Sequence, residues 1–313
     1  MAVKSVSAPR FTLRFLLPNY WHVWLGVLIL YIISWLPFSL IRILGKGFGR
    51  LLGRIAPKRV AVAKRNIALT FPHWSTRKQQ DVFQANIDRT GMALFETAMG
   101  WWWPAWRVQK HVEYEGFEHV EKILASGKGV FGLALHNVNL EFGCRSVGYI
   151  HPSIGFYRKH NNPLVDYLQY HGRNRANKYM VDKRNAKAFI QALNNGEFCL
   201  YLPDQDYGAA QSIFVPFGGV SHTATTTATL MFAERANCEP LLVSSMYTRR
   251  GYKIKFLPAI EYFADKDKHE ALTLLNKDIL SLVELQPDSY LWMHKRFKTR
   301  PPEAPESLYE QLE

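Results

Sequence analysis

A histidine and a glutamate five positions apart are the residues of this sequence best suited to chemistry. His136 and Glu141 lie in the segment HNVNLE, which directly follows the apolar run GVFGLAL. An imidazole oriented by a carboxylate can act as a general base, and a hydroxyl on the substrate would then serve as the nucleophile. On spacing alone, a histidine with a purely structural role is the more frequent explanation of such a pair.

The spacing also limits where the two residues can lie. Five positions on a continuous helix turn by about 500°, which leaves the two side chains roughly 140° apart. We therefore expect His136 in a loop, Asn137 or Asn139 as the helix N-cap, and Glu141 in the first turn, with its carboxylate on one imidazole nitrogen. Asn137, Asn139 and the first backbone N–H groups could also donate hydrogen bonds to an oxyanion, although plain helix capping would explain both asparagines.

Short apolar runs alternate with amphipathic stretches from Val112 onward. This pattern predicts an α/β fold with a central, mostly parallel or mixed sheet flanked by helices. His136 falls at the carboxyl end of a predicted strand, where sites form in open α/β sheets. The predicted strands lie within 112–116, 127–135, 153–158, 178–181, 197–206, 238–247 and 252–256. The predicted helices lie within 75–100, 120–125, 136–149, 163–175, 185–196, 223–235 and 268–286.

Positive charge and a long apolar run both concentrate near the N-terminus. The first 80 residues hold 13 of the 39 Lys and Arg and no Asp or Glu, so the remaining 26 basic residues balance all 26 acidic ones. Residues 15–41 lack any Asp, Glu, Lys or Arg, which predicts a helix long enough to cross a bilayer, with Pro37 as its kink or end. One alternative is a cleaved signal peptide, but no small-residue cleavage site follows the apolar run. The other is a buried or re-entrant amphipathic hairpin.

Basic residues are more numerous after the apolar run than before it. Eight lie between Arg42 and Arg65 and three precede the run, which predicts that the C-terminal bulk of the chain lies on the cytoplasmic side of the membrane. We expect an anchor over 1–45, basic amphipathic helices and a Trp-rich membrane-proximal region over 46–110, and the catalytic α/β domain over 111–313. The basic helices could lie on anionic lipid or pack on the domain as solvated helices. Three cysteines far apart suggest no disulfide and a reducing compartment.

Several sequence blocks together resemble one enzyme family. HNVNLE is similar to the HxxxxD/E motif of the glycerolipid acyltransferase superfamily, and the remaining blocks resemble the late acyltransferases of lipid A biosynthesis, the lauroyl/myristoyl transferase family. The resemblance covers nearly the full length and the blocks fall in the family's order. They are FLLPNYWHVWLG, KRNIALTFPHWS, ETAMGWWW, GKGVFGLALHNVNLEFG, YRKHNNPLVDYLQYHGRNRANK, YLPDQDYGAAQSIFVPFGGV, ATTTATLMFA and SYLWMHKRFKTRPP.

The resemblance implies an activity, partners and site residues. The donor would be acyl-acyl-carrier-protein, and the acceptor a hydroxyl of a 3-hydroxyacyl chain on a Kdo-bearing lipid A precursor. The protein would lie at the bacterial inner membrane, single-pass or monotopic, with its catalytic domain on the cytoplasmic side. His136 and Glu141 match the catalytic pair, and Arg173 and Asp204 match further functional positions. No cofactor is implied, and no metal-ligand spacing or nucleotide loop occurs in the sequence.

Other polar residues fit binding roles. Arg158, with Lys159, His160, Arg173 and Arg175, would form a basic group suited to the phosphates of the acceptor or to an acidic carrier protein. Asp204 could hold an arginine, bind acceptor hydroxyls or form a structural turn. Cys144 is better explained as a small buried thiol than as an acylated nucleophile.

Three other functions compete with this hypothesis. A lysophosphatidic acid acyltransferase would share the HxxxxD motif, but its EGTR-type block is absent and YLPDQDYG stands in the comparable region. A catalytically inactive, membrane-associated lipid-binding protein on the same fold would not need His136 and Glu141. Nucleic-acid binding rests on the basic isoelectric point alone, and the interleaved apolar residues argue against it.

Overall fold

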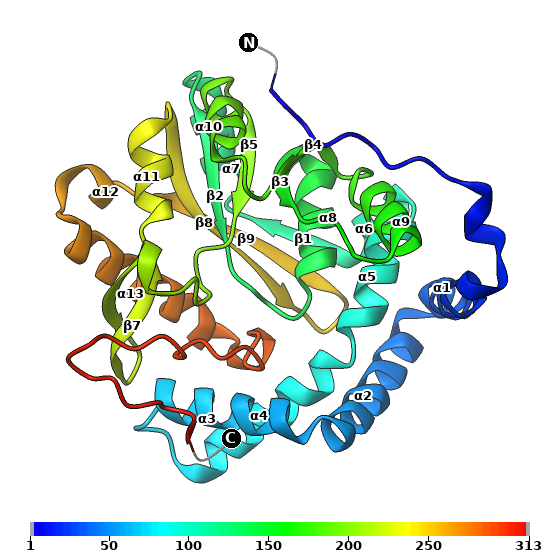
Figure 1. Ribbon diagram of the computed structural model, residues 1–313, viewed down its shortest axis with the longest axis horizontal. Helices are drawn as coiled ribbons and strands as arrows, with labels where there is room; N and C mark the ends of the chain where they lie inside the picture. The colour runs from blue at the N-terminus through cyan, green and yellow to red at the C-terminus, as the bar shows by residue number, and fades with distance from the viewer. Residues whose placement is uncertain (1–2, 311–313) are drawn as a thin grey trace.

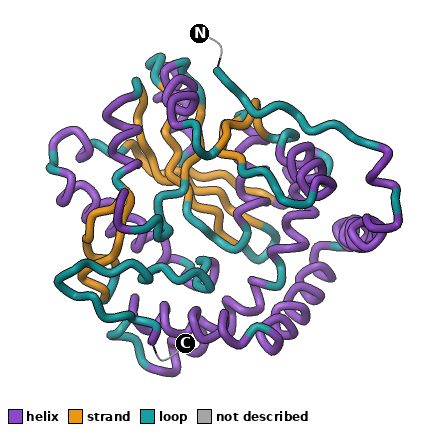
Figure 2. Tube along the Cα trace, viewed as in Figure 1, coloured by secondary structure: helices purple, strands orange, loops and turns teal. Residues whose placement is uncertain are grey.

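Seven strands form one central sheet in the order β1-β9-β8-β2-β5-β3-β4 in the computed structural model, which describes residues 3–310. Neighbouring strands run parallel except for the antiparallel pair β8 and β9. Figure 2 shows this sheet in the middle of the molecule with helices around it. The prediction of an α/β fold with a mostly parallel central sheet is therefore confirmed.

The elements follow one another along the chain as labelled in Figure 1. The strands of the central sheet are β1 (Val112–Glu115), β2 (Gly129–Ala134), β3 (Ser153–Tyr157), β4 (Asn177–Asp182), β5 (Phe198–Tyr201), β8 (Cys238–Tyr247) and β9 (Tyr252–Ala259). The helices among and after them are α7 (Phe117–Ala125), α8 (Leu140–Ile150), α9 (Pro163–Arg173), α10 (Ala186–Asn194), α11 (Ala228–Arg235), α12 (Tyr262–Asp265) and α13 (Lys268–Leu285). Six helices precede the sheet: α1 (Trp21–Trp35), α2 (Phe38–Ile55), α3 (Pro57–Thr70), α4 (Thr76–Thr90), α5 (Ala93–Trp102) and α6 (Ala105–His111).

The long apolar run near the N-terminus divides into two helices. The backbone is extended at Leu36 and non-helical at Pro37, so α1 ends at Trp35 and α2 begins at Phe38. At about 1.5 Å per residue, the 15 residues of α1 reach roughly 22 Å, short of a hydrocarbon layer of about 30 Å. The one helix predicted across residues 15–41 is thus two helices, and within residues 3–310 no helix is both long enough and apolar enough to cross a bilayer.

Close packing of α2 on α4 leaves apolar side chains of α2 uncovered. A Cβ at Gly49 would lie 2.1 Å from the Ile87 carbonyl oxygen, and one at Gly91 would lie 2.0 Å from the Gly45 oxygen. The glycine face of α2 is therefore pressed against α4. Ile43, with an exposed fraction of 67%, belongs to the apolar side chains of α2 that remain exposed.

Two predicted helices are divided in the structure. The helix predicted over 75–100 turns at Gly91 and continues as α5. The helix predicted over 223–235 is wrong in its first half, because Val220–Thr226 forms strand β7. That strand pairs with β6 (Ser212–Phe217) in an antiparallel hairpin that the sequence interpretation missed. The β-branched threonines of ATTTA suit a strand better than a helix.

The Trp-rich turn after α5 is partly core and partly surface. Trp103 is fully buried and its indole N–H donates to the Ser34 carbonyl, which ties the turn to α1. Trp106 is 60% exposed at the start of α6. Both interpretations of this motif, an aromatic core corner and an interface loop, thus describe part of it.

Candidate active site

His136 lies in the loop between β2 and α8, two residues beyond the end of the strand. All six residues of β2 are buried, and the strand pairs on both sides, with β8 and β5. The C-terminal segment holds this loop in place. The Leu291 N–H donates a hydrogen bond to the His136 carbonyl, and Asn137 forms an isolated antiparallel β-bridge with Tyr290. This rigid setting fixes the direction of the imidazole at the carboxyl edge of the sheet.

Both carboxylate oxygens of Asp204 contact His136, one at the imidazole and the other at the backbone. Oδ1 lies 2.6 Å from His136 Nδ1, and Oδ2 accepts a hydrogen bond of 2.9 Å from the His136 backbone N–H. The carboxylate side chain is fully buried, whereas 17% of the imidazole is exposed. An ionised carboxylate only accepts hydrogen bonds, so Nδ1 carries the proton and the neutral ring leaves Nε2 free to take another.

Adjacent strands explain why His136 and Asp204 meet. Asp204 follows β5 as His136 follows β2, and the two strands are parallel neighbours in the sheet. Burial alone would raise the pKa of the Asp204 carboxyl, but the charge and hydrogen bonds of His136, with a further contribution from Arg296, hold that pKa below its ordinary value. The carboxylate is therefore ionised at neutral pH and can stabilise an imidazolium.

Glu141 pairs with Arg173 rather than with His136. Glu141 lies in the first turn of α8, as predicted, and its carboxylate accepts two hydrogen bonds from the Arg173 guanidinium at the end of α9. Within the part of the chain that the structure describes, no hydrogen bond joins Glu141 to the imidazole. The prediction that Glu141 orients His136 is thus corrected, because Asp204 occupies Nδ1 and Arg173 occupies the Glu141 carboxylate.

The two asparagines between His136 and Glu141 face the protein interior. The Asn137 side-chain amide donates to the Ser245 carbonyl at 2.8 Å and to the Ser244 hydroxyl at 3.2 Å. Asn139 is the N-cap residue of α8 and is fully buried. Neither lines the cleft beside His136, so the expectation that their side chains contact substrate is corrected. Backbone N–H groups at the start of α8 remain the candidates for an oxyanion site.

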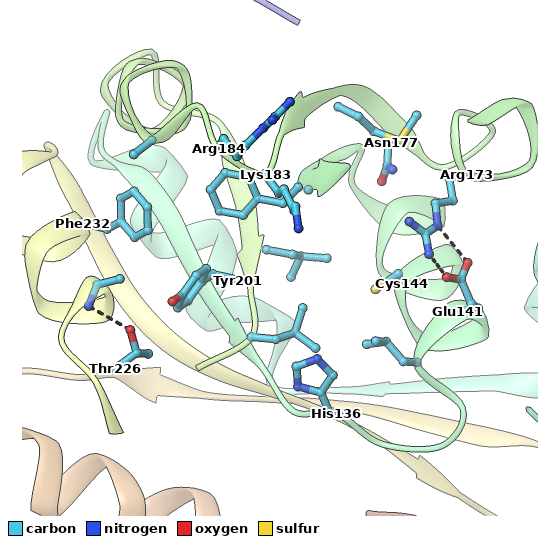
Figure 3. A pocket seen from close by; sticks show the side chains of 18 of the residues that line it. His136, Glu141, Cys144, Arg173, Asn177, Lys183, Arg184, Tyr201, Thr226 and Phe232 are labelled. Carbon is cyan, nitrogen blue, oxygen red and sulfur yellow. Dashed lines mark hydrogen bonds and ion pairs between the residues drawn. The ribbon is translucent and has the colours of Figure 1, made fainter. Parts of the chain in front are cut away.

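His136 and the Glu141–Arg173 pair lie in the wall of one cleft of about 910 Å³. Figure 3 shows Phe232 and Tyr201 on one side of it and Glu141 and Arg173 on the other, with His136 at one end. Lys183 and Arg184, which the sequence interpretation did not single out, lie at the end away from His136 (Figure 3). Apolar groups form much of the surface between these polar ends; they come from Leu140, Phe156, Met180, Leu200, Leu202, Met231 and Phe232.

Two further candidates, Cys144 and Arg158, and the nearby carboxylate of Asp206 have other surroundings. Cys144 lines the cleft, but burial, with the nearby Glu141 charge, raises the pKa of its thiol to about 12, which leaves a poor nucleophile. Arg158 is exposed on the loop after β3. Asp206 accepts hydrogen bonds from the Thr299 backbone N–H and hydroxyl, so it ties the loop after β5 to the C-terminal segment.

The fold and this cleft define a class: an α/β protein with a histidine–carboxylate pair at the end of a cleft with apolar walls. Residues 8–299 match the family described as bacterial lipid A biosynthesis acyltransferase. The chain is 37% identical to the lipid A biosynthesis lauroyltransferase of Escherichia coli K12, over 96% of this chain and 98% of the relative. It is 34% identical to the lipid A biosynthesis palmitoleoyltransferase of the same organism, over 93% of this chain and 96% of the relative.

A solved structure, the 1-acyl-sn-glycerophosphate acyltransferase PlsC of Thermotoga maritima, aligns with 79% of this chain and 96% of its own, at 13% identity and a TM-score of 0.37. The matches in sequence are the informative ones. The chain belongs to the bacterial lipid A biosynthesis acyltransferases and is therefore an acyltransferase.

Proposed function

We propose that this protein transfers a fatty acyl chain from acyl-acyl-carrier-protein to a hydroxyl of a 3-hydroxyacyl chain on a Kdo-bearing lipid A precursor. One observation carries the proposal: the buried Asp204 carboxylate holds the imidazole of His136 at the end of a cleft with apolar walls. A general base with an adjoining apolar cavity is what an enzyme needs to activate a hydroxyl beside a long acyl chain.

His136 acts as the base in this reaction. Nε2 removes the proton of the acceptor hydroxyl while Nδ1 keeps its hydrogen bond to Asp204. The acceptor oxygen attacks the thioester carbonyl, and the tetrahedral oxyanion is stabilised by backbone N–H groups at the start of α8. The carbon–sulfur bond then breaks, and the imidazolium returns its proton to the leaving thiolate. The products are an ester on the acceptor and a free carrier thiol, so no external oxidant or reductant is needed.

The Glu141–Arg173 pair completes the site as an anion-binding group in the cleft wall. Burial would lower the pKa of Arg173, but the Glu141 carboxylate raises it above its ordinary value, so the guanidinium is firmly cationic. The Glu141 carboxylate accepts hydrogen bonds from two N–H groups of Arg173 and thereby fixes the direction of the guanidinium. In this proposal Arg173 faces a phosphate or the reacting carbonyl of a bound lipid, and Glu141 acts on catalysis through Arg173.

Exposed apolar side chains on α1 and α2 support attachment to one leaflet of the inner membrane. Trp21 is 62% exposed, Leu25 59% and Ile43 67%. The basic residue Arg54 is exposed on α2, which suits an anionic surface. We propose a monotopic enzyme whose α1 and α2 enter the cytoplasmic leaflet, so that a lipid acceptor reaches the cleft from the bilayer.

A comparison of acceptors and donors tests the proposed function. Purified protein is given one of two donors, acyl-acyl-carrier-protein or acyl-coenzyme A. Each donor is combined with either a Kdo-bearing lipid A precursor or lysophosphatidic acid, and the products are identified by mass spectrometry. We expect the mass of one acyl chain to be added to the lipid A precursor, with carrier protein as the better donor. Acylation of lysophosphatidic acid alone would replace this proposal with a glycerophospholipid acyltransferase, and no transfer to either acceptor would favour a lipid-binding protein.

A further inference from the structure

A cluster of exposed cations surrounds the end of the cleft that lies away from His136. The loop after β3, the loop after β4 and the first turn of α10 carry it. We call these residues the rim cations: Arg158, Lys159, Lys183, Arg184 and Lys187. Lys183 and Arg184 line the cleft itself, and Figure 3 shows them at the opposite end from His136.

The two loops form one surface because the strands before them are paired. Tyr157 of β3 lies opposite Asp182 of β4, and the Lys183 N–H donates to the Tyr157 carbonyl at 3.1 Å. Arg158 and Lys183, which follow these paired residues, are therefore neighbours at the sheet edge. Lys183 and Arg184 also directly precede α10, whose N-terminus adds partial positive charge at the same place.

Little negative charge opposes the rim cations. Asp166 and Asp182 are the acidic residues of the segment 151–196. Asp166 is buried and accepts hydrogen bonds from the Tyr157 hydroxyl and the His160 N–H. Asp182 pairs with Arg184 on the surface at 3.3 Å, where 84% of the arginine side chain is exposed, so this pair neutralises Arg184 only weakly. The patch thus remains strongly cationic.

The patch also differs from the surface that we assign to the membrane. Cations of α2 alternate with large exposed apolar side chains such as Ile43 and Leu51, as expected of a helix in a lipid interface. Among the residues described between 151 and 196, no large hydrophobic side chain is exposed. Figure 1 shows α10 and α1 on well-separated parts of the molecule. A charged surface without apolar anchors suits a soluble acidic partner better than a bilayer.

We propose that the rim cations dock the acidic carrier protein that delivers the acyl thioester. This inference rests on the proposed function and names the surface used by its donor. The carrier would bind at the rim, and its flexible prosthetic arm would extend along the cleft toward His136. Docking through surface charge speeds encounter and adds specificity for the carrier.

A charge-reversal variant in the full chain tests this docking surface. R158E/K159E, at the rim cations on the loop after β3, is compared with K122E/K277E, a control with the same change in net charge on exposed residues of α7 and α13. Arg158 and Lys159 do not line the cleft, so we expect R158E/K159E to raise KM for the acylated carrier protein by about tenfold at low salt, with kcat nearly unchanged. The difference should shrink at high salt because ions screen exposed charges. The control should stay within about twofold of the wild type.

Three further measurements separate carrier docking from other uses of the same cations. A short acyl-pantetheine thioester without the carrier should react equally well with wild type and R158E/K159E. KM for the lipid acceptor and binding to anionic vesicles should also be unchanged. A rise in KM for the short thioester or for the acceptor, or a loss of vesicle binding, would overturn carrier docking.

Direct binding separates failure of this inference from failure of the proposed function. If the wild type transfers no acyl group from any donor, the proposed function fails, and fluorescence anisotropy of labelled acyl-carrier-protein still reports docking. Binding by the wild type that R158E/K159E loses and the control keeps supports the surface. Absence of binding by the wild type, or equal binding by both variants, refutes it.

Discussion

Replacing Asp204 by asparagine removes one negative charge and leaves the side-chain shape nearly unchanged. The carboxylate makes two short contacts with one residue, 2.6 Å to His136 Nδ1 and 2.9 Å to its backbone N–H, and its side chain is fully buried. An amide can accept only one of these hydrogen bonds, and it cannot stabilise the imidazolium that forms during proton transfer. The wrong tautomer, with the proton on Nε2, would then become favourable.

The loss in rate follows from these contacts. Removing the charge behind a catalytic imidazole costs about 10²–10⁴ in kcat, or roughly 3–5 kcal/mol of transition-state stabilisation. We expect D204N to lose kcat in this range, with KM for donor and acceptor changed by less than about threefold. Because the pKa of the Asp204 carboxyl lies below its ordinary value, the wild type should keep this carboxylate ionised throughout the neutral range.

Asp206 provides the matched control for this substitution. It lies two residues further along the same loop, and its carboxylate holds Thr299 instead of the imidazole. D206N should lower the melting temperature and leave kcat within about threefold of the wild type. Steady-state kinetics on both variants, with folding checked by circular dichroism, decides the matter. A D204N variant with near-normal kcat, or an equal loss in D206N, would refute the assignment of Asp204 as the orienting carboxylate.

Three further predictions concern the cleft wall, the core and the surface. E141Q removes the negative charge that holds the Arg173 guanidinium, so it should lower kcat/KM by about 10- to 100-fold. Unchanged steady-state kinetics would contradict this. Burial raises the pKa of Glu96 to about 8, so the folded protein holds an extra proton and its stability should fall as pH rises from about 4.5 to 8. Thermal melts should show this slope in the wild type and a flatter one in E96Q, whereas parallel curves would exclude it. W21A/L25A should weaken binding to anionic vesicles by at least about tenfold while L285A, another exposed leucine, does not; equal binding by both would argue against α1 as the membrane contact.

Local patterns in the sequence predicted the elements near the site well. The buried run before His136 is strand β2, Glu141 lies in the first turn of the next helix, and Gly196, with a φ of 76°, directly follows the turn that ends α10. Apolar periodicity and glycine position depend on neighbouring residues, so one sequence is enough to read them.

The partner of His136 could not be found in this way. Asp204 is 68 residues away in the chain, and it reaches the imidazole only because β2 and β5 are neighbours in the sheet. A single sequence does not give the order of strands, so the nearest carboxylate, Glu141, was chosen instead. One pattern in the sequence did point to this pair: His136 and Asp204 each follow a buried strand. Polar residues that follow parallel strands meet at the same edge of the sheet.

The errors at the N-terminus and in the hairpin have local physical causes. Hydropathy summed over residues 15–41 suggested one spanning helix, but the extended backbone at Leu36 and Pro37 ends α1 after 15 residues. In the segment ATTTATLMFA, Thr225 and Thr226 belong to strand β7 and the residues from Ala228 onward to α11, so one amphipathic window covered two elements.

The central claim is that His136 performs the acyl transfer, and lipid A itself reports it most directly. Cells lacking this protein are supplied with the wild type or with H136A, expressed at matched levels, and their lipid A is analysed by mass spectrometry. The wild type should add the mass of one acyl chain, whereas H136A, although present and folded, should add none. Lipid A that carries the same added chain with H136A as with the wild type would contradict it.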